Sequence, residues 1–194
     1  MTYNYKYIFA LDPSGNFEEG KGTTGWVLMD CNENLLERGY ITAVDYRCAE
    51  EYWQAHVDLL FKYKKLYRNQ IIVVMEDYIL YRNRAENQTN SKIETCRLLG
   101  VLQWQCWRLN LPYTMQLASA VKTRWSDDIL LEEGIIKRKG RKIFHVKSDK
   151  DISLEHTRDA FRHAIHYIII RNKRSQASKR YKKIKNGYFI KARY

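Results

Sequence analysis

The pattern of apolar and polar positions predicts strands and helices that alternate along most of the chain. Short apolar runs rich in β-branched residues predict strands, and longer runs with apolar residues at helical spacing predict amphipathic helices. The predicted strands are Tyr5–Leu11, Thr23–Asp30, Leu35–Ala43, Ile71–Met75 and Tyr113–Leu117. The predicted helices are Ala49–Leu66, Thr89–Leu109, Ser119–Asp127 and Ser153–Arg171. For Gly134–Lys150 we predict an exposed basic hairpin or loop.

The order of these elements indicates the fold class. Three strands in succession precede a helix, and the next strand, Ile71–Met75, is an unbroken apolar run typical of a central strand buried on both faces. This order favours an α/β domain with a mixed central sheet flanked by helices. Such sheets bind ligands beyond the carboxyl ends of their strands. Neither of the two prolines marks a boundary, so we expect one domain over residues 1–170.

Basic residues are concentrated at the C-terminal end of the chain. The sequence has 34 Lys and Arg against 22 Asp and Glu, and ten of these cations lie in residues 171–194, where there is no acid. Cations interleaved with aromatic rings suit phosphates and exposed bases. We therefore interpret residues 171–194 as a nucleic-acid-binding tail, with a solvated, solubilising end as the alternative. The tail residues assigned to DNA contact are Lys179, Arg180, Lys182 and Lys183.

Cysteine spacing and the lengths of the apolar runs bear on the compartment. The four cysteines include no CxxC pair, so we expect no structural zinc site built on cysteines, and free thiols fit a reducing compartment. No run reaches the ~18 apolar residues of a membrane helix. No secretory signal is visible before the first strand. These features predict a cytoplasmic protein with no membrane partner.

Three acids and a histidine stand at the ends of predicted elements. Asp12 ends the first strand, and Glu76 directly follows the central strand. His156 and Asp159 lie three residues apart on one face of the last helix. If the two strands are neighbours, Asp12 and Glu76 repel each other, and a divalent cation would remove that conflict. Carboxylates with one imidazole suit Mg²⁺ or Mn²⁺, although each residue alone also fits a turn, a solvated strand end or a helix start.

Taken in order, these segments resemble the RuvC family of Holliday junction resolvases. The family's opening Asp-Pro-Gly turn and its Thr-Gly-aromatic strand are similar to Phe9–Gly15 and Thr24–Trp26. The matches to its second acidic strand, its lysine segment and its metal-binding helix are Val73–Glu76, Met115–Lys122 and Glu155–Ala160. The resemblance covers roughly residues 7–170.

The resemblance implies an RNase H-like fold, a homodimer and paired nicks across a four-way DNA junction. It implies two Mg²⁺ or Mn²⁺ ions in each active site, bound by Asp12, Glu76, His156 and Asp159. It also implies that Lys122 lies near the scissile phosphate, where its charge would offset developing negative charge. An ordinary surface lysine is the alternative for Lys122.

The chain also departs from the family pattern. Ser14-Gly15 replaces a tighter Pro-Gly, the following loop is longer, and the basic segment 134–150 and the basic tail are additions. With a short chain rich in Lys, Asn and Tyr, these departures indicate a bacteriophage version that works in the cytoplasm of a bacterial host and acts on branched DNA more broadly. Further candidates for contact with the open centre of a junction, with ordinary packing as the alternative, are Tyr78, Tyr81 and Arg82.

Three other classes share part of the pattern. An actin-like ATP-binding domain is similar in Asp12 followed by Gly22–Gly25, but such proteins need a second domain and a second glycine-rich loop. A zinc site on His163 and His166 would need an outside ligand, and packing of these histidines against the sheet is the simpler interpretation. A non-catalytic branched-DNA-binding protein would share the basic tail and would not need the acids.

Overall fold

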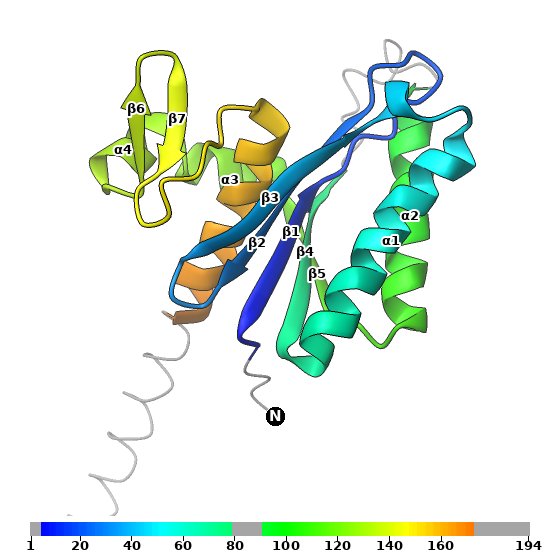
Figure 1. The fold of residues 1–194 in the computed structure, drawn as a ribbon, viewed down its shortest axis with the longest axis horizontal. Helices are drawn as coiled ribbons and strands as arrows, with labels where there is room; N and C mark the ends of the chain where they lie inside the picture. The colour runs from blue at the N-terminus through cyan, green and yellow to red at the C-terminus, as the bar shows by residue number, and fades with distance from the viewer. Residues whose placement is uncertain (1–4, 79–90, 173–194) are drawn as a thin grey trace, which may run out of the picture.

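A five-stranded mixed sheet is the centre of the structure (Figure 1). The computed structural model describes residues 5–78 and 91–172. In spatial order the strands are β3 (Leu35–Thr42), β2 (Thr23–Asp30), β1 (Tyr7–Asp12), β4 (Ile71–Asp77) and β5 (Tyr113–Leu117). Because β1 pairs antiparallel with β2 and parallel with β4, the sheet is mixed, as the sequence predicts.

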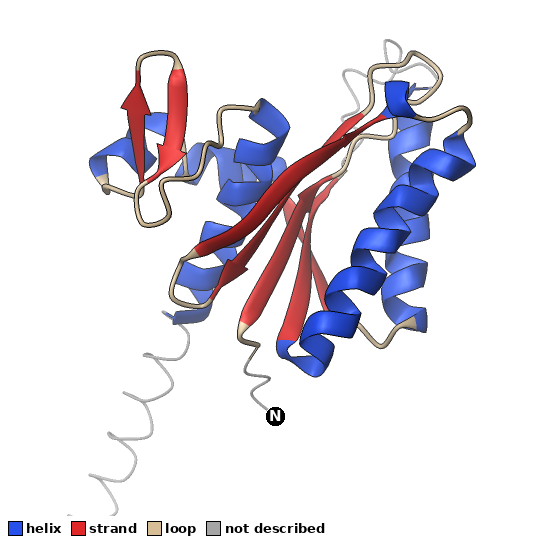
Figure 2. Cartoon of the chain, in the orientation of Figure 1, coloured by secondary structure: helices blue, strands red, loops and turns tan. Residues whose placement is uncertain are grey.

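Side chains of the central strands alternate between two hydrophobic clusters. In β1, Ile8 and Ala10 belong to one cluster, whereas Phe9 and Leu11 belong to the other. This alternation follows from the two-residue period of a strand. Both faces of the sheet are therefore apolar and need a cover, and Figure 2 shows helices on both sides of it.

Different elements cover the two faces. One face packs against α1 (Ala49–Tyr67) and α2 (Ser91–Arg108). The other packs against the final helix, described over 155–172, together with α3 (Ala118–Arg124), α4 (Asp127–Glu132) and the hairpin of β6 (Ile136–Lys139) and β7 (Lys142–His145). Short 3-10 turns precede α1 and β4 at Ala43–Asp45 and Arg68–Gln70. In Figure 1 the hairpin and α1 lie on opposite sides of the molecule.

The predicted helix Ser119–Asp127 is wrong as a single element. The chain forms α3, leaves the helix at Trp125 and starts α4 at Asp127. The Ser126 hydroxyl caps the new helix by accepting a hydrogen bond from the Ile129 N–H at 3.3 Å. Serine competes with a continuing helix because its side chain satisfies backbone groups that a helix start leaves open.

The segment 134–150 forms the predicted hairpin, but it is not exposed throughout. Ile136, Ile143 and His145 are buried on the side that faces the final helix. These three residues share one face of the two-stranded ribbon because Ile136 pairs with His145 and alternate residues point the same way. The sequence pattern did not predict this burial, because the charged residues of the tip dominate the segment.

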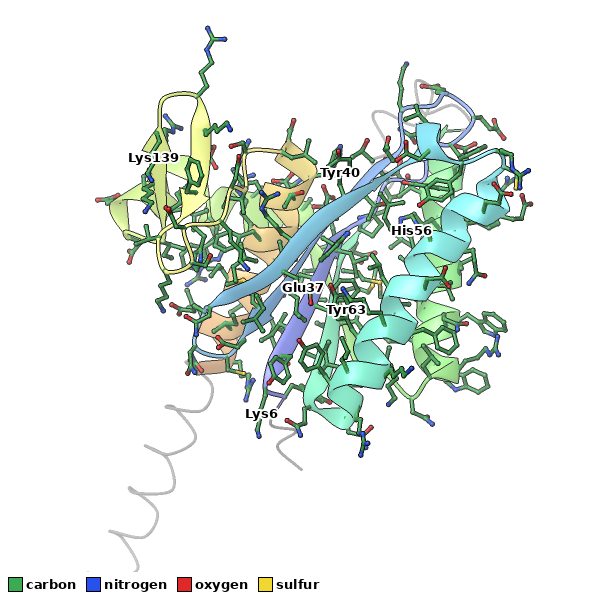
Figure 3. The ribbon with its side chains drawn as sticks, viewed as in Figure 1. Lys6, Glu37, Tyr40, His56, Tyr63 and Lys139 are labelled. Atoms are coloured by element: carbon green, nitrogen blue, oxygen red, sulfur yellow. The ribbon has the colours of Figure 1, made fainter. Side chains whose placement is uncertain are left out.

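A neutral hydrogen-bonded cluster ties α1 to the sheet. The fully buried His56 contacts the Tyr52 carbonyl oxygen at 2.7 Å through Nδ1 and the Thr24 hydroxyl at 2.8 Å through Nε2. Burial lowers the pKa of His56 to about 4, so the ring is neutral at physiological pH. Figure 3 shows His56 between α1 and the sheet.

Candidate active site

The carboxyl ends of β1 and β4 place two acids side by side. The parallel register pairs Leu11 with Met75, so Asp12 and Glu76 are the next residues along neighbouring strands. Strand alternation then directs both acids to the face that the final helix covers. This adjacency was expected from the sequence if the two strands were neighbours, and the structure confirms that they are.

Gly25 allows the final helix to approach the end of β1. Gly25 pairs with Asp12 across the β1–β2 ladder. A Cβ atom at Gly25 would lie 2.1 Å from the His156 carbonyl carbon and 2.3 Å from the Thr157 nitrogen, so no side chain fits there. This close approach places His156 Nδ1 at 2.8 Å from Asp12 Oδ2.

Lys122 lies between the other two acids. Its Nζ is 2.8 Å from Asp159 Oδ2 and 3.3 Å from Glu76 Oε2. The lysine reaches them because α3 begins directly after β5, the strand next to Glu76. Desolvation alone would lower the pKa of Lys122, but the hydrogen bond to Asp159 and the nearby carboxylates raise it above its ordinary value. Lys122 is therefore a charged member of the cluster and not an isolated surface lysine.

His163 is a member of the site that the sequence interpretation did not assign to it. The ring is fully buried, with Nε2 at 2.9 Å from Glu76 Oε2 and Nδ1 at 2.8 Å from Gln116 Oε1. Gln116 is the β5 partner of Glu76. Burial of His163 against the sheet was predicted, but its bond to Glu76 was not. The available signal was its position four residues after Asp159, on the same helical face.

A further carboxylate, that of Asp127, contacts the site through two arginines of the final helix. Arg162 forms ion pairs with both Asp159 and Asp127, and Arg158 Nε lies 3.2 Å from Asp127 Oδ1. Asp127 is the first residue of α4, where a carboxylate also interacts favourably with the helix N-terminus. Arg162 therefore links the position of Asp159 to that of α4.

The site contains an electrostatic conflict between Asp12 and Glu76. Burial raises the pKa of Asp12 to about 6, with a further contribution from the negative charge of Glu76, although the hydrogen bond from His156 opposes the shift. Glu76 is also desolvated, yet hydrogen bonding to His163 and the charge of Lys122 keep its pKa below the ordinary value. The hydrogen bond to Asp12 raises the pKa of His156. Such opposed shifts in paired acids are typical of functional sites.

The donor chemistry of this cluster fits a hard divalent cation. Three carboxylates and one imidazole are ligand types of Mg²⁺ and Mn²⁺. A cation would favour the ionised form of Asp12 against burial and the charge of Glu76, which together raise its pKa. Within residues 5–78 and 91–172, no three of the His, Cys, Asp and Glu side chains are arranged so that they could hold a metal ion. The acids are paired with His156, Lys122, His163 and Arg162 instead. Metal binding would therefore require some of these pairs to open.

The zinc alternative gains no support from the two later histidines. His163 contacts Glu76 and Gln116, whereas His166 accepts a hydrogen bond from Trp125 Nε1 at 3.2 Å. Among the residues that the structure describes, His163 and His166 therefore share no hydrogen-bond partner that could complete a zinc site with them.

The remaining candidates for DNA contact are only partly described. Tyr78 follows β4 directly and is half-buried, and this burial raises its pKa. The candidates outside the described residues are Tyr81, Arg82, Lys179, Arg180, Lys182 and Lys183.

Two solved structures of a bacterial protein have a similar fold. No family model and no curated protein matches the chain. Thermus thermophilus RuvC in complex with a Holliday junction substrate matches with a TM-score of 0.63 at 15% identity, over 87% of this chain and 97% of that one. A second structure of that RuvC matches with a TM-score of 0.59 at 15% identity, over 86% and 96% of the two chains. The likeness shows that the chain has the RNase H-like α/β fold.

None of the described helices combines the length and the apolar character that crossing a bilayer requires.

Proposed function

We propose that the protein is a divalent-metal-dependent endodeoxyribonuclease that resolves Holliday junctions and related branched DNA by paired phosphodiester nicks. The observation that carries the proposal is the convergence of Asp12, Glu76, Lys122, His156 and Asp159 at one end of the sheet. These residues come from four separate segments of the sequence. Their fold is shared with a RuvC solved in complex with a Holliday junction substrate.

The chain's own residues have distinct roles in this proposal. Asp12, Glu76, His156 and Asp159 would hold one or two Mg²⁺ or Mn²⁺ ions, which when bound supply activation of water and stabilisation of the leaving 3′-oxygen. Lys122, released from the carboxylates, would place its charge near the reacting phosphate.

Two neighbouring residues would keep the ligands in place. His163 bonds to Glu76, and Arg162 bonds to Asp159, so each holds one carboxylate from outside the ligand set. Partners of this kind orient metal ligands and typically affect metal affinity when they are changed.

Paired nicks require two active sites, so we include a homodimer in the proposal. A four-way junction presents two equivalent strands, and a two-fold dimer matches that symmetry. On α2, Trp104 and Trp107 are 55% and 73% exposed, and Phe61 on α1 is also exposed. We assign this apolar face to contact with a second copy. Replacement of Trp104 and Trp107 by Glu should then give a monomer by light scattering, and this monomer should nick single strands without pairing the cuts.

The departures from the bacterial pattern support a bacteriophage version acting in the cytoplasm of its host. The basic hairpin and the basic sequence 171–194 add cations to those of the family pattern. Added phosphate contacts would broaden the range of branched substrates, since such contacts carry no base information.

Cleavage of defined DNA substrates tests the function. A synthetic four-way junction, a Y-fork and a linear duplex are incubated with wild type and Asp12→Asn in Mg²⁺, Mn²⁺ or EDTA. We expect metal-dependent paired nicks in the junction and none with Asp12→Asn. Equal cutting of the Y-fork would widen the activity to a general branched-DNA nuclease.

One observation favours a second candidate, a non-catalytic branched-DNA-binding protein. The acids of the site are already paired with Lys122, His156, His163 and Arg162. Tight junction binding without cutting in any metal would support this candidate and contradict the nuclease.

A further inference from the structure

The β6–β7 hairpin carries a dense group of cations at its free end. Residues 137–142 read Lys-Arg-Lys-Gly-Arg-Lys, which is five cations in six positions. The exposed members are Arg138, Lys139, Arg141 and Lys142. Figure 3 shows Lys139 on the hairpin, on the opposite side of the molecule from His56 and Tyr63.

The charges of the hairpin tip are only partly compensated. Lys137 and Lys139 lie 2.7 Å and 3.5 Å from Asp149, and Lys142 lies 3.9 Å from Asp151. Arg138 and Arg141 form no ion pair with any other residue that the structure describes. Two acids therefore face five cations, and the uncompensated charge is concentrated at the tip.

Folding of the hairpin alone does not account for this arrangement. Lys139 and Lys142 are direct cross-strand partners, and like charges in that position destabilise a strand pair. The turn between them has two residues, with Gly140 at a φ of +61° as a tight hairpin turn requires. The turn would form equally well between uncharged strand ends, so the cations point to an anionic partner.

The outward face of the hairpin combines cations with an aromatic ring. Lys137 pairs across the ribbon with Phe144, and Lys139 Nζ lies 5.2 Å from the centroid of the Phe144 ring. Lys137, Lys139, Lys142 and Phe144 share this face by strand alternation. Five cations in six positions suit the phosphate backbone of nucleic acid, because cations neutralise phosphates and release their counterions.

The base of the hairpin is fixed to the helix that carries half of the acidic site. The His145 ring lies 5.3 Å from the ring of Phe161, two residues after Asp159. The Ile143 N–H donates to the Ser153 hydroxyl at 2.9 Å, just before the final helix begins. The tip thus keeps a defined position relative to His156 and Asp159.

A second set of contacts fixes the connection after β7 to the sheet. Lys147 donates to the Asn32 carbonyl oxygen at 2.8 Å, and Lys150 donates to the Leu36 carbonyl oxygen. Asn32 lies in the turn between β2 and β3, and Leu36 is the second residue of β3. A charged arm anchored on two sides loses little conformational entropy when it binds.

We propose that the β6–β7 hairpin is a second DNA-binding element, which contacts the phosphate backbone of a duplex arm of the junction outside the active site. This inference rests on the proposed function and adds to it a contact surface that does not read sequence. Each strand of four residues is about 13 Å long, enough to face several phosphates. The hairpin would hold an arm in a fixed direction while the acids act at the branch.

The salt dependence of junction binding tests the hairpin. Arg138, Lys139, Arg141 and Lys142 are all changed to Gln in an Asp12→Asn background, which keeps the DNA uncut. The dissociation constant for a long-armed junction is measured over a range of salt concentrations. Each lost phosphate contact should reduce the log–log slope by about 0.9, so two to four contacts should reduce it by about 2 to 4.

A matched variant controls for net charge. Four cations at the end of α1 and just after it, namely Lys62, Lys64, Lys65 and Arg68, are changed to Gln. They precede the start of β4, at the end of the sheet opposite Glu76. We expect this variant to change the slope by less than about 1. Thermal unfolding checks that both variants are folded.

The outcomes separate the hairpin from the nuclease. An unchanged slope in the hairpin variant, with wild type still cutting junctions, overturns the hairpin proposal and leaves the proposed function in place. Equal losses in both variants also overturn it, because net charge then explains the binding. A wild type that neither binds nor cuts branched DNA contradicts the proposed function itself. Shortening the duplex arms should remove the difference between the hairpin variant and its parent.

Discussion

The buried polar groups on the two faces of the sheet differ in charge: one face holds a neutral histidine, and the other holds a cluster of acids and cations. On the side of α1, His56 is neutral and each of its ring nitrogens has one partner, the Tyr52 carbonyl or the Thr24 hydroxyl. On the side of the final helix, burial and the negative charge of Glu76 raise the pKa of Asp12, and the positive charge of Lys122 acts on both acids. A neutral, fully paired cluster stabilises a fold, whereas concentrated like charges cost stability and indicate a function.

The largest expected effect is on the charged face. Asp12→Asn removes a proposed metal ligand and one of two repelling acids. Cleavage of a four-way junction should fall at least about 1,000-fold, while the melting temperature stays equal or rises, because a buried carboxylate and its repulsion with Glu76 are gone. Gel-based cleavage and thermal unfolding measure the two quantities. A variant that loses activity together with several degrees of stability would show that Asp12 is mainly structural.

The second prediction concerns how closely the final helix meets the sheet. A methyl group at Gly25 would overlap the backbone of His156 and Thr157, so Gly25→Ala should displace the helix start. We expect about a 100-fold loss of cleavage and about 1–3 kcal/mol of destabilisation. Gly100→Ala is the control, because a Cβ atom at Gly100 would have nothing within 4 Å and alanine favours a helix by about 1 kcal/mol. Wild-type cleavage by Gly25→Ala would contradict the proposed positioning of His156.

Part of the fold and the positions of four residues of the candidate site could be predicted from the sequence. The two-residue period of the strands places Asp12 and Glu76 at adjacent ends once β1 and β4 are paired, and the spacing of His156 and Asp159 places them on one helical face. Periodicity is a local property, so it survives without tertiary information. The bounds of β2 and β5 agree with the prediction for the same reason.

The partners of these residues could not be predicted in the same way. His163 meets Glu76 only because β5 lies beside β4 and presents Gln116 to the same ring. That contact depends on strand order and helix rotation, which the sequence pattern does not encode locally. The burial of Ile143 under a charged hairpin tip was missed for a similar reason, since the helix that covers it is distant in sequence.

The third prediction is a smaller effect, a change in the metal dependence of cleavage when His163 on the charged face is replaced. His163→Gln removes the imidazole that bonds Glu76, so the carboxylate should be held less firmly. The Mn²⁺ concentration for half-maximal cleavage should rise about tenfold or more, and saturating metal should restore most of the rate. His166→Gln, which loses only a bond from Trp125, should leave the metal dependence unchanged. A loss of activity that metal cannot restore would assign His163 to folding alone.

The smallest effect belongs to the neutral face and concerns stability only. The pKa of His56 is lowered to about 4 in the folded protein, so the unfolded chain binds more protons between that value and about 6.5. The contribution of His56 is therefore complete above pH 6.5 and is lost as the pH falls toward 4. Between pH 7.5 and pH 5 the wild type should lose about 1–2 kcal/mol more unfolding free energy than His56→Gln, measured by urea denaturation.

His145 also has a pKa lowered to about 4 by burial, so its own share of the pH dependence should remain in His56→Gln. Equal pH dependence in wild type and His56→Gln would mean that the His56 ring is not buried in neutral form. The α1 face would then resemble the charged face, where ionisation and folding are coupled. Junction cleavage at pH 7.5 should be the same for both proteins, because His56 contacts none of the acids of the site.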